Sequence, residues 1–213
     1  MDIIQYLTDR ARQTKVGFTD LTQAADEVYL ENTPDESGKI ATRLFSSDVY
    51  QARMIAVLLL GRVSAQRQQY VPYLKNIVSG DANWRVQEML ARAIDRYCQD
   101  TGYESALPII QEWLDDERPN VKRAVAEGLR IWTARPYFRH VPEHAVGMLA
   151  PLRADESDYV RRSVGNAIRD ISRQHGDVVL RELMKWDQSD DKVAQVYLLA
   201  SGLLKKHVTS ARR

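Results

Sequence analysis

Apolar residues recur every three or four positions along most of the chain, which is the spacing of one face of an α-helix. Residues 121–129 and 160–168 each place Val, Val and then Leu or Ile four residues apart, with a small residue beside the stripe. No segment alternates polar and apolar residues for long enough to predict a β-strand. The pattern therefore predicts an all-helical chain.

Five of the helical segments resemble one another and recur at a nearly constant interval. They begin at Gln51, Val86, Val121, Val160 and Gln195, so that successive starts lie 35, 35, 39 and 35 residues apart. Another amphipathic segment precedes each of the last four. These preceding helices are expected over residues 70–78, 103–114, 142–152 and 178–186. The repeating unit is therefore a pair of helices.

Helix pairs at this interval are typical of tetratricopeptide or HEAT repeats, and the Trp and Leu-Gly signature of the tetratricopeptide type is absent. We expect an all-α, HEAT-like helical-repeat solenoid (an α-α superhelix) whose aligned helices line a concave basic face. The chain would form a single domain over residues 1–213. Its parts would be an N-terminal helical cap (1–45, with a loop at 32–38), stacked helix pairs (46–207) and a flexible basic tail (208–213).

Capping residues support this division. Acidic and Asn-containing segments precede the aligned helices, at residues 81–83, 116–120, 155–158 and 190–191. Such residues accept hydrogen bonds from the free N–H groups of a first helical turn. Gly80, Gly102 and Gly176 follow apolar-periodic runs and are expected to end helices.

Composition narrows the possible functions. With 44% hydrophobic and 28% charged residues the chain is expected to be globular rather than disordered. A net charge of +1 gives no long-range attraction to a polyanion, so nucleic-acid binding would have to come from local patterns. The sole cysteine, Cys98, excludes a disulfide framework within the chain and favours a reducing, cytoplasmic location. We find no signal peptide, and the longest apolar run, Met54–Leu60, is too short to span a membrane.

Equivalent positions of stacked helices form columns on a repeat protein. The third aligned position is Arg53, Glu88, Arg123, Arg162 and Tyr197. With neighbouring basic residues, this column gives a stripe that could hold a phosphate backbone. The residues expected to contact DNA are Arg53, Arg85, Lys122, Arg123, Arg161 and Arg162. The alternative is that these side chains keep the helices solvated and pair with acids in adjoining loops.

Trp84 and Glu88 lie four residues apart and so emerge on the same side of one helix. An indole beside a carboxylate suits a cationic ring, and the carboxylate would stabilise an oxocarbenium ion if a sugar–base bond broke nearby. Alternatively, Trp84 packs against the core and Glu88 only favours the helix dipole.

The other tryptophans and the histidines give no sign of a binding or catalytic site. Trp113, Trp132 and Trp186 are expected in the core or at its rim. His140 and His144 are four residues apart, but Pro142 interrupts any helix joining them and no third ligand is near in sequence, so we expect no metal site. Motifs for phosphate-binding loops, zinc or calcium are also missing, and no cofactor is expected.

Three stretches carry a family resemblance: Trp84–Glu88, Asn120–Val125 and Tyr159–Asp170. From about Tyr70 onwards the chain resembles the HEAT-like repeat DNA alkylation repair superfamily, the AlkD/AlkC-like alkylpurine DNA glycosylases. The resemblance implies a helical solenoid that cradles duplex DNA and excises positively charged alkylpurines, without the base flipping used by most such enzymes.

The functional residues of the AlkD branch can be matched to positions in this chain one by one. Trp84 matches the first aromatic residue of the AlkD branch, Glu88 its catalytic carboxylate, which is Asp there, and Arg123 its basic contact. Asn166 stands in place of a second Trp, and an amide cannot form an indole wall around a cationic sugar. Because of this change, the resemblance implies a divergent branch with impaired excision.

Two functions remain as hypotheses. The first is a DNA alkylation repair protein that binds duplex DNA and acts as a monofunctional N-glycosylase through Glu88 and Trp84. The second is a catalytically inactive scaffold that binds a protein or undamaged nucleic acid. Neither requires a cofactor or a membrane.

Overall fold

The computed structural model describes residues 2–15 and 17–204, and at 131 and 132 only the backbone. All regular elements in these residues are helices, which confirms the all-α prediction. The chain divides into two compact units, Met1–Ala106 and Leu107–Arg213. The predicted single domain stays a prediction, and the basic tail (208–213) lies outside the described residues.

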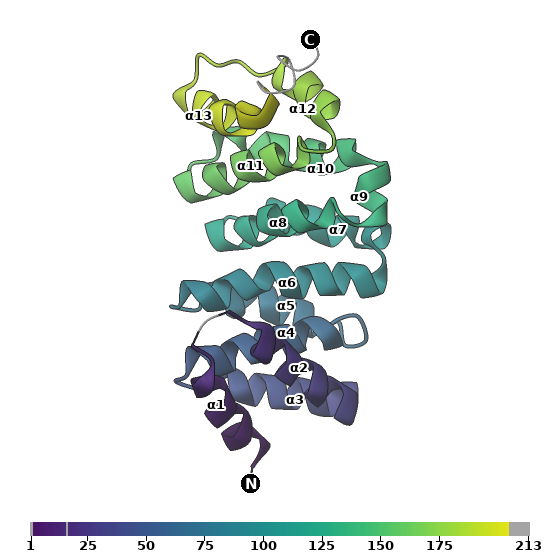
Figure 1. Ribbon diagram of the computed structural model, residues 1–213, viewed down its shortest axis with the longest axis vertical. Coiled ribbons are helices and arrows are strands. Elements are labelled where there is room, and N and C mark those ends of the chain that lie inside the picture. The colour runs from purple at the N-terminus through teal and green to yellow at the C-terminus, as the bar shows by residue number, and fades with distance from the viewer. Residues whose placement is uncertain (1, 16, 205–213) are drawn as a thin grey trace. The chain divides into compact units, whose positions relative to one another are not determined.

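The first unit is built around one buried helix. Its elements are α1 (Ile3–Gln13), α2 (Thr19–Glu31), α3 (Pro34–Phe45), α4 (Tyr50–Val63), α5 (Tyr70–Asn76), the short 3₁₀ helix η1 (Val78–Gly80) and α6 (Trp84–Thr101). Helix α4 packs against α1, α2, α3 and α6, and Figure 1 shows it between α3 and α6. The apolar run Met54–Leu60 is buried throughout, as expected for a helix that is apolar on all sides.

A glycine sets the contact between α4 and α6. A Cβ atom added at Gly61 would lie 2.7 Å from the Cα atom of Ala93. Because no side chain separates them, the two helix backbones approach closely at this point. Gly61 therefore marks the point where α4 and α6 come closest.

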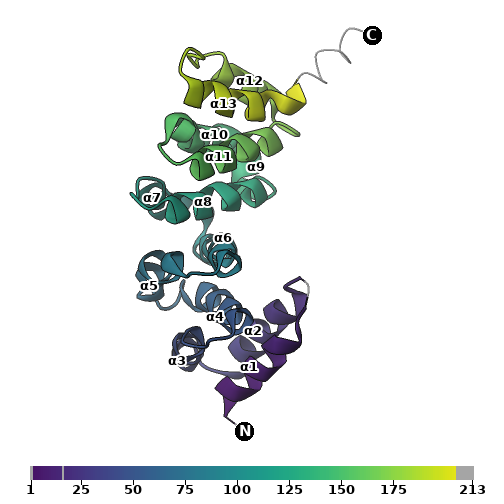
Figure 2. The ribbon, with the colours of Figure 1, turned by 90° about the vertical axis from the view of Figure 1, so that its left-hand side faces the viewer.

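The second unit stacks the later repeats. Helix α7 (Tyr103–Leu114) spans the boundary between the units. It is followed by α8 (Pro119–Trp132), α9 (Pro136–His140), α10 (Pro142–Leu149), η2 (Ala150–Ala154), α11 (Asp158–Ile171), α12 (Gly176–Leu183), α13 (Asp191–Ala200) and η3 (Ser201–Leu203). Helix α11 packs against both α8 and α13 and lies between them in Figure 2. Helix α10 packs against α12, so the first and second helices of each pair occupy separate layers within this unit.

Most predicted helices are confirmed. The aligned segments form α4, α6, α8, α11 and α13, and the preceding ones form α5, α7, α10 and α12. Trp113 and Trp186 are buried, as expected, and so is Cys98, whose thiol pKa is raised by burial. None of the helices in the described residues is long and apolar enough to cross a membrane.

Two local predictions were wrong, and one short helix was not predicted. The loop expected at Asn32–Gly38 is mostly helix, because Thr33 and Glu36 form a capping box that starts α3 at Pro34. Gly176 begins α12 rather than ending a helix. The short helix α9 was not expected, although Pro136 at its first turn favours a helix start. In contrast, Gly102 ends α6 with φ of +93°, as a terminating glycine should.

Candidate nucleic-acid interface

A repeated turn orients the second helix of each pair. A carboxylate oxygen accepts a hydrogen bond from the N–H group two residues later, at 2.7–2.9 Å. The four pairs are Asp81 with Asn83, Asp116 with Arg118, Asp155 with Ser157 and Asp190 with Lys192. These turns precede α6, α8, α11 and α13 and confirm the predicted start signals.

Two of these turn carboxylates also bind a basic residue of the preceding second helix. Arg53 of α4 donates to both oxygens of Asp81, at 2.7 and 3.0 Å, and to the carbonyl oxygen of Ser47 at 2.9 Å. The Asp81 hydrogen bond raises the pKa of the guanidinium, and the Arg53 side chain is only 17% exposed. In the second unit Lys122 of α8 donates to Asp155 at 2.6 Å. Arg53 and Lys122 therefore tie one repeat to the next.

Arg161 has a similar structural role. Its side chain donates to Gln195 of α13 at 2.8 Å and to the carbonyl oxygen of Asp155 at 2.7 Å. Three of the six basic residues expected to contact DNA therefore have mostly buried side chains, 11–18% exposed, that are held by contacts within the chain.

Of the other three basic residues, Arg85 and Arg162 are exposed, whereas Arg123 is half-buried and its Nε atom is buried. Arg162 is 66% exposed and pairs with Asp158 at 2.7 Å. The guanidinium of Arg85 lies 4.3 Å from the ring centre of Trp84. That of Arg123 lies 4.1 Å from the ring centre of Tyr159. An exposed guanidinium such as that of Arg85 or Arg162 can reach phosphate without breaking a buried contact.

Two aromatic partners of these arginines were missed in the sequence. Tyr159 stacks with Arg123, and the ring centre of Tyr50 lies 5.8 Å from the Arg85 guanidinium. Both tyrosines stand immediately before an aligned segment, at equivalent positions of their repeats. Extending the alignment by one residue would have shown this shared aromatic position.

Trp84 and Glu88 lie in the first turns of α6, which Asn83 caps by accepting a hydrogen bond from the N–H of Arg85 at 3.0 Å. The indole is 49% exposed, and the Glu88 side chain is half-buried one turn later. These residues belong to the first unit, with Arg53 and Arg85. Lys122, Arg123, Arg161, Arg162 and the half-buried Asn166 belong to the second.

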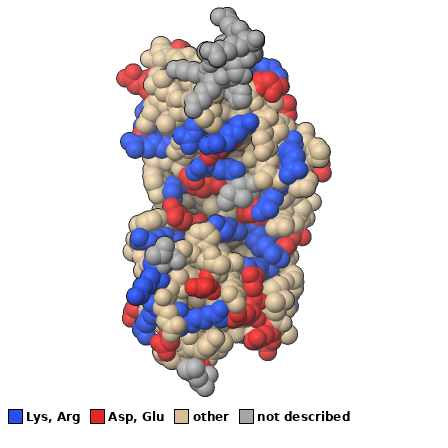
Figure 3. Space-filling view, in the orientation of Figure 1, with Lys and Arg blue, Asp and Glu red and all other residues tan. Residues whose placement is uncertain are grey.

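Acidic side chains interrupt the basic ones at the surface. Figure 3 shows Lys and Arg side chains next to Asp and Glu on both units, in the orientation of Figure 1. The ion pairs of Arg162 with Asp158 and of Lys192 with Glu156, at 2.7 Å each, belong to this pattern. The local positive charge is therefore partly neutralised within the chain.

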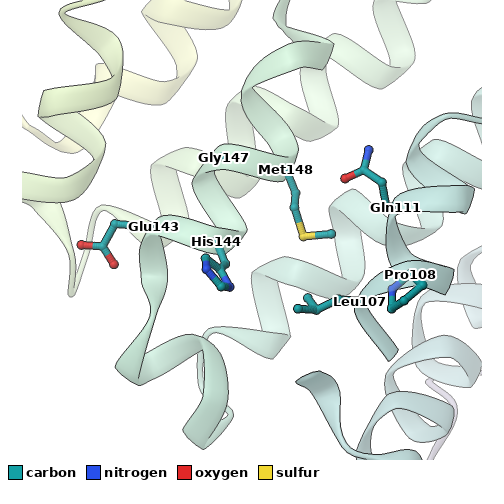
Figure 4. Close-up of a pocket in the computed structure, with 7 residues that line it drawn as sticks. All are labelled: Leu107, Pro108, Gln111, Glu143, His144, Gly147 and Met148. Atoms are coloured by element: carbon teal, nitrogen blue, oxygen red, sulfur yellow. The ribbon is translucent and has the colours of Figure 1, made fainter. Parts of the chain in front are cut away.

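A separate apolar groove of about 500 Å³ lies between α7 and α10. Leu107, Pro108 and Gln111 line it from α7, and His144, Gly147 and Met148 line it from α10. In Figure 4 the side chain of Glu143 points away from the other labelled residues. The residues that line the groove include none of the predicted site residues.

No group of three or more His, Cys, Asp or Glu that could hold a metal ion occurs in the part of the chain that the structure describes. Of the two neighbouring histidines, His144 places Nδ1 2.7 Å from the hydroxyl of Tyr137.

Helix pairs that recur at a near-constant interval and stack on one another define the class of HEAT-like helical-repeat proteins. A family model described as "DNA alkylation repair enzyme" matches residues 5–197. The chain belongs to this family, which confirms the resemblance found in the sequence.

Solved structures agree with this assignment. AlkD2 from Streptococcus mutans is 43% identical, with a TM-score of 0.89 over 94% of this chain and 98% of that one. The protein smu.31 from Streptococcus mutans UA159 is 42% identical, with a TM-score of 0.87 over the same shares. A TOG domain of crescerin, at 12% identity and a TM-score of 0.57, covers 92% of this chain and 88% of that one and shares the fold alone.

A curated relative matches over a shorter stretch. The uncharacterised protein YhaZ from Bacillus subtilis (strain 168) is 30% identical over 87 residues. The match spans 39% of this chain and about a quarter (24%) of YhaZ.

Proposed function

We propose that this protein binds duplex DNA and hydrolyses the N-glycosidic bond of cationic alkylpurines. The observation that supports this most directly is the half-exposed indole of Trp84 with the carboxyl group of Glu88 one turn later on α6. Membership of the DNA alkylation repair family is the second support. The DNA partner and the reaction are both part of the proposal.

The chemistry follows from the charge of the substrate. An alkylated purine such as 7-methylguanine carries a positive charge while attached to the sugar, and it leaves as a neutral base with the electrons of the glycosidic bond. The indole face would attract the cation, and the Glu88 carboxylate would stabilise the oxocarbenium character at C1′ and orient the attacking water. Water adds to C1′ and releases a proton, so no cofactor is consumed.

The six basic residues would contribute in two ways. Arg85 and Arg162 would contact phosphates directly, because they are the exposed members of the set, and Arg123 would do so from its place on the ring of Tyr159. Arg53 and Lys122 would act mainly by fixing the turns before α6 and α11, and Arg161 by joining the turn before α11 to Gln195 of α13. They would reach phosphate only by giving up these internal contacts.

An excision assay tests the enzyme. We expect the wild type to release 7-methylguanine or 3-methyladenine slowly from methylated duplex DNA, because Asn166 supplies no second indole. Glu88→Gln should abolish the release, and Trp84→Ala should reduce it at least tenfold. The exposed Glu104→Gln variant on α7 is the matched control and should retain full activity. Absence of release by the wild type on every methylated duplex would refute the glycosylase proposal.

A second candidate function is a non-catalytic scaffold that binds a protein or undamaged nucleic acid. The internal hydrogen bonds of three basic residues favour the scaffold, because they leave fewer donors for the phosphates of a damaged duplex. These residues are Arg53, Lys122 and Arg161. Under this alternative the wild type excises no base, and Glu88→Gln leaves every measured binding affinity unchanged.

A further inference from the structure

A second cavity, of about 320 Å³, lies in the second unit where α8 and α11 end. Arg130 lines it from the last turn of α8 and Asp170 from the last turn of α11. Thr133 and Arg173 line it from the turns that follow these helices, and His175 from the residue before α12. Its walls are more polar than those of the groove between α7 and α10, and a cavity of this size accommodates a small molecule.

Two buried polar atoms in this cavity lack hydrogen bonds. Within the described residues, neither Oδ1 of Asp170 nor Nε2 of His175 has a hydrogen-bond partner. Buried polar atoms are nearly always hydrogen-bonded, so such an atom in a cavity indicates a site for a polar ligand. Asp170 Oδ1 can only accept a hydrogen bond, whereas His175 Nε2 can donate one when protonated.

Positive charges surround these two atoms. Arg130 donates to the other oxygen of Asp170 at 2.8 Å and to Glu127 at 2.8 Å. Burial alone would lower the pKa of its guanidinium, but these two carboxylates together raise it. Arg173 places Nε 3.6 Å from Asp170 Oδ1, and its side chain is 64% exposed, so it is able to turn towards a ligand. Arg169 also lies 3.5 Å from the same oxygen. The cavity thus combines several cationic donors with one strong acceptor.

We propose that this cavity binds a phosphomonoester in its singly protonated form. Arg173 and His175 Nε2–H would donate to phosphate oxygens, and the P–OH group would donate to Asp170 Oδ1. A phosphomonoester has its second pKa near 6, so roughly a quarter of it is singly protonated at pH 6.5. Sulfate has no proton to offer, and its oxygens would face the Asp170 carboxylate with no hydrogen bond. The site therefore prefers phosphate over sulfate.

Phosphate titration of the full chain tests the site at pH 6.5 and constant ionic strength, with the NMR signals of the His175 ring as the readout. His175→Phe identifies those signals. We expect a saturable shift with inorganic phosphate and at least tenfold weaker binding of sulfate. Arg173→Gln should weaken phosphate binding at least tenfold. The control Arg181→Gln, which removes an arginine of similar exposure (60%) from α12, should leave it unchanged.

Asp170→Asn separates selectivity from affinity, because removal of the carboxylate charge should allow sulfate to bind as tightly as phosphate. Equal responses to phosphate and sulfate in the wild type, or equal responses of Arg173→Gln and Arg181→Gln, would overturn the proposal.

The source of the phosphomonoester is tested with a thymidine trinucleotide, too short to span several repeats. Competition by the 5′-phosphorylated trinucleotide but not by its 5′-hydroxyl form would identify a DNA strand end as the ligand. Competition by free nucleoside monophosphate alone would identify a free phosphomonoester. Equal competition by the 5′-hydroxyl form would assign phosphodiester binding instead and refute the proposal. None of these outcomes depends on glycosylase activity.

Discussion

Arg53 and Arg162 occupy the same aligned position in their repeats but have different surroundings. Arg53 is mostly buried against Asp81, whereas Arg162 extends into solvent beside Asp158. Removal of one partner of a buried pair leaves an uncompensated charge, whereas an exposed pair contributes little. An arginine at this aligned position can therefore be either a buried structural residue or an exposed one, and the repeat alignment alone does not distinguish the two.

We expect Arg53→Gln to lower the free energy of unfolding by about 3 kcal/mol, because Asp81 would stay buried without its guanidinium. Arg162→Gln should change it by less than about 0.5 kcal/mol. Urea denaturation measures both. If Arg162→Gln destabilises the protein as much as Arg53→Gln, the structural role given to Arg53 is incorrect.

Two helical glycines give a second contrast at the residue scale. A Cβ at Gly61 would overlap the backbone of Ala93, whereas one at Gly147 on α10 would meet no atom within 4 Å. We expect Gly61→Ala to destabilise the protein by about 1–3 kcal/mol through overpacking. Gly147→Ala should stabilise it by about 0.5–1 kcal/mol through a lower backbone entropy of the unfolded chain. Denaturant midpoints for the two variants should move in opposite directions.

At the scale of the element, α3 shows how a short polar motif starts a helix. The hydroxyl of Thr33 accepts from the N–H of Glu36, and the Glu36 carboxylate accepts from the N–H of Thr33 at 3.0 Å. The hydrogen bonds from the side chain and backbone of Thr33 lower the pKa of Glu36 below its ordinary 4.5. We expect Thr33→Ala to cost about 1 kcal/mol of stability, as is usual for loss of an N-cap.

The direction of the Glu36 shift predicts a pH effect. A carboxyl group with a lowered folded-state pKa stabilises the fold fully above its unfolded pKa, here 4.5, and loses that contribution as pH falls through the folded pKa. Glu36→Gln should therefore lose less stability than the wild type between pH 6 and pH 3.5. Denaturant midpoints at both pH values measure the difference. An identical loss in the two proteins would contradict this role of Glu36.

At the scale of the whole molecule, 30 basic and 29 acidic residues leave almost no net charge. Affinity for DNA must then come from local contacts, each of which releases counterions from the duplex. The number of released ions can be measured as the slope of log affinity against log salt concentration.

We expect a slope of roughly −2, because about 0.9 is contributed per phosphate contact and, of the six predicted residues, Arg85 and Arg162 are the exposed ones. Contact by all six predicted residues would give roughly −5. Arg162→Gln should reduce the slope by about 1. Binding that does not weaken with salt would exclude phosphate contacts and favour the scaffold.

The repeat architecture was predictable because its signals are local. The helical period of residues 121–129, the recurrence of the aligned segments and the Asp residues before them all act within a few residues. Even the capping box of Thr33 and Glu36 was present in the sequence, and the expected loop at residues 32–38 was wrong because that motif was not recognised. The candidate site was predictable only as far as Trp84 and Glu88 sharing one side of a helix.

The amino-acid sequence by itself determined the helices, their pairing and the family, because periodicity, caps and repeat spacing are properties of neighbouring residues. Only the tertiary structure decided which charges are neutralised, because Arg53 meets Asp81 across 28 residues of chain and Lys122 meets Asp155 across 33. It also decided that Arg123 stacks on Tyr159 and that Asp170 and His175 line a cavity. Such partners are brought together by helix packing, whose geometry depends on the whole core rather than on any one segment.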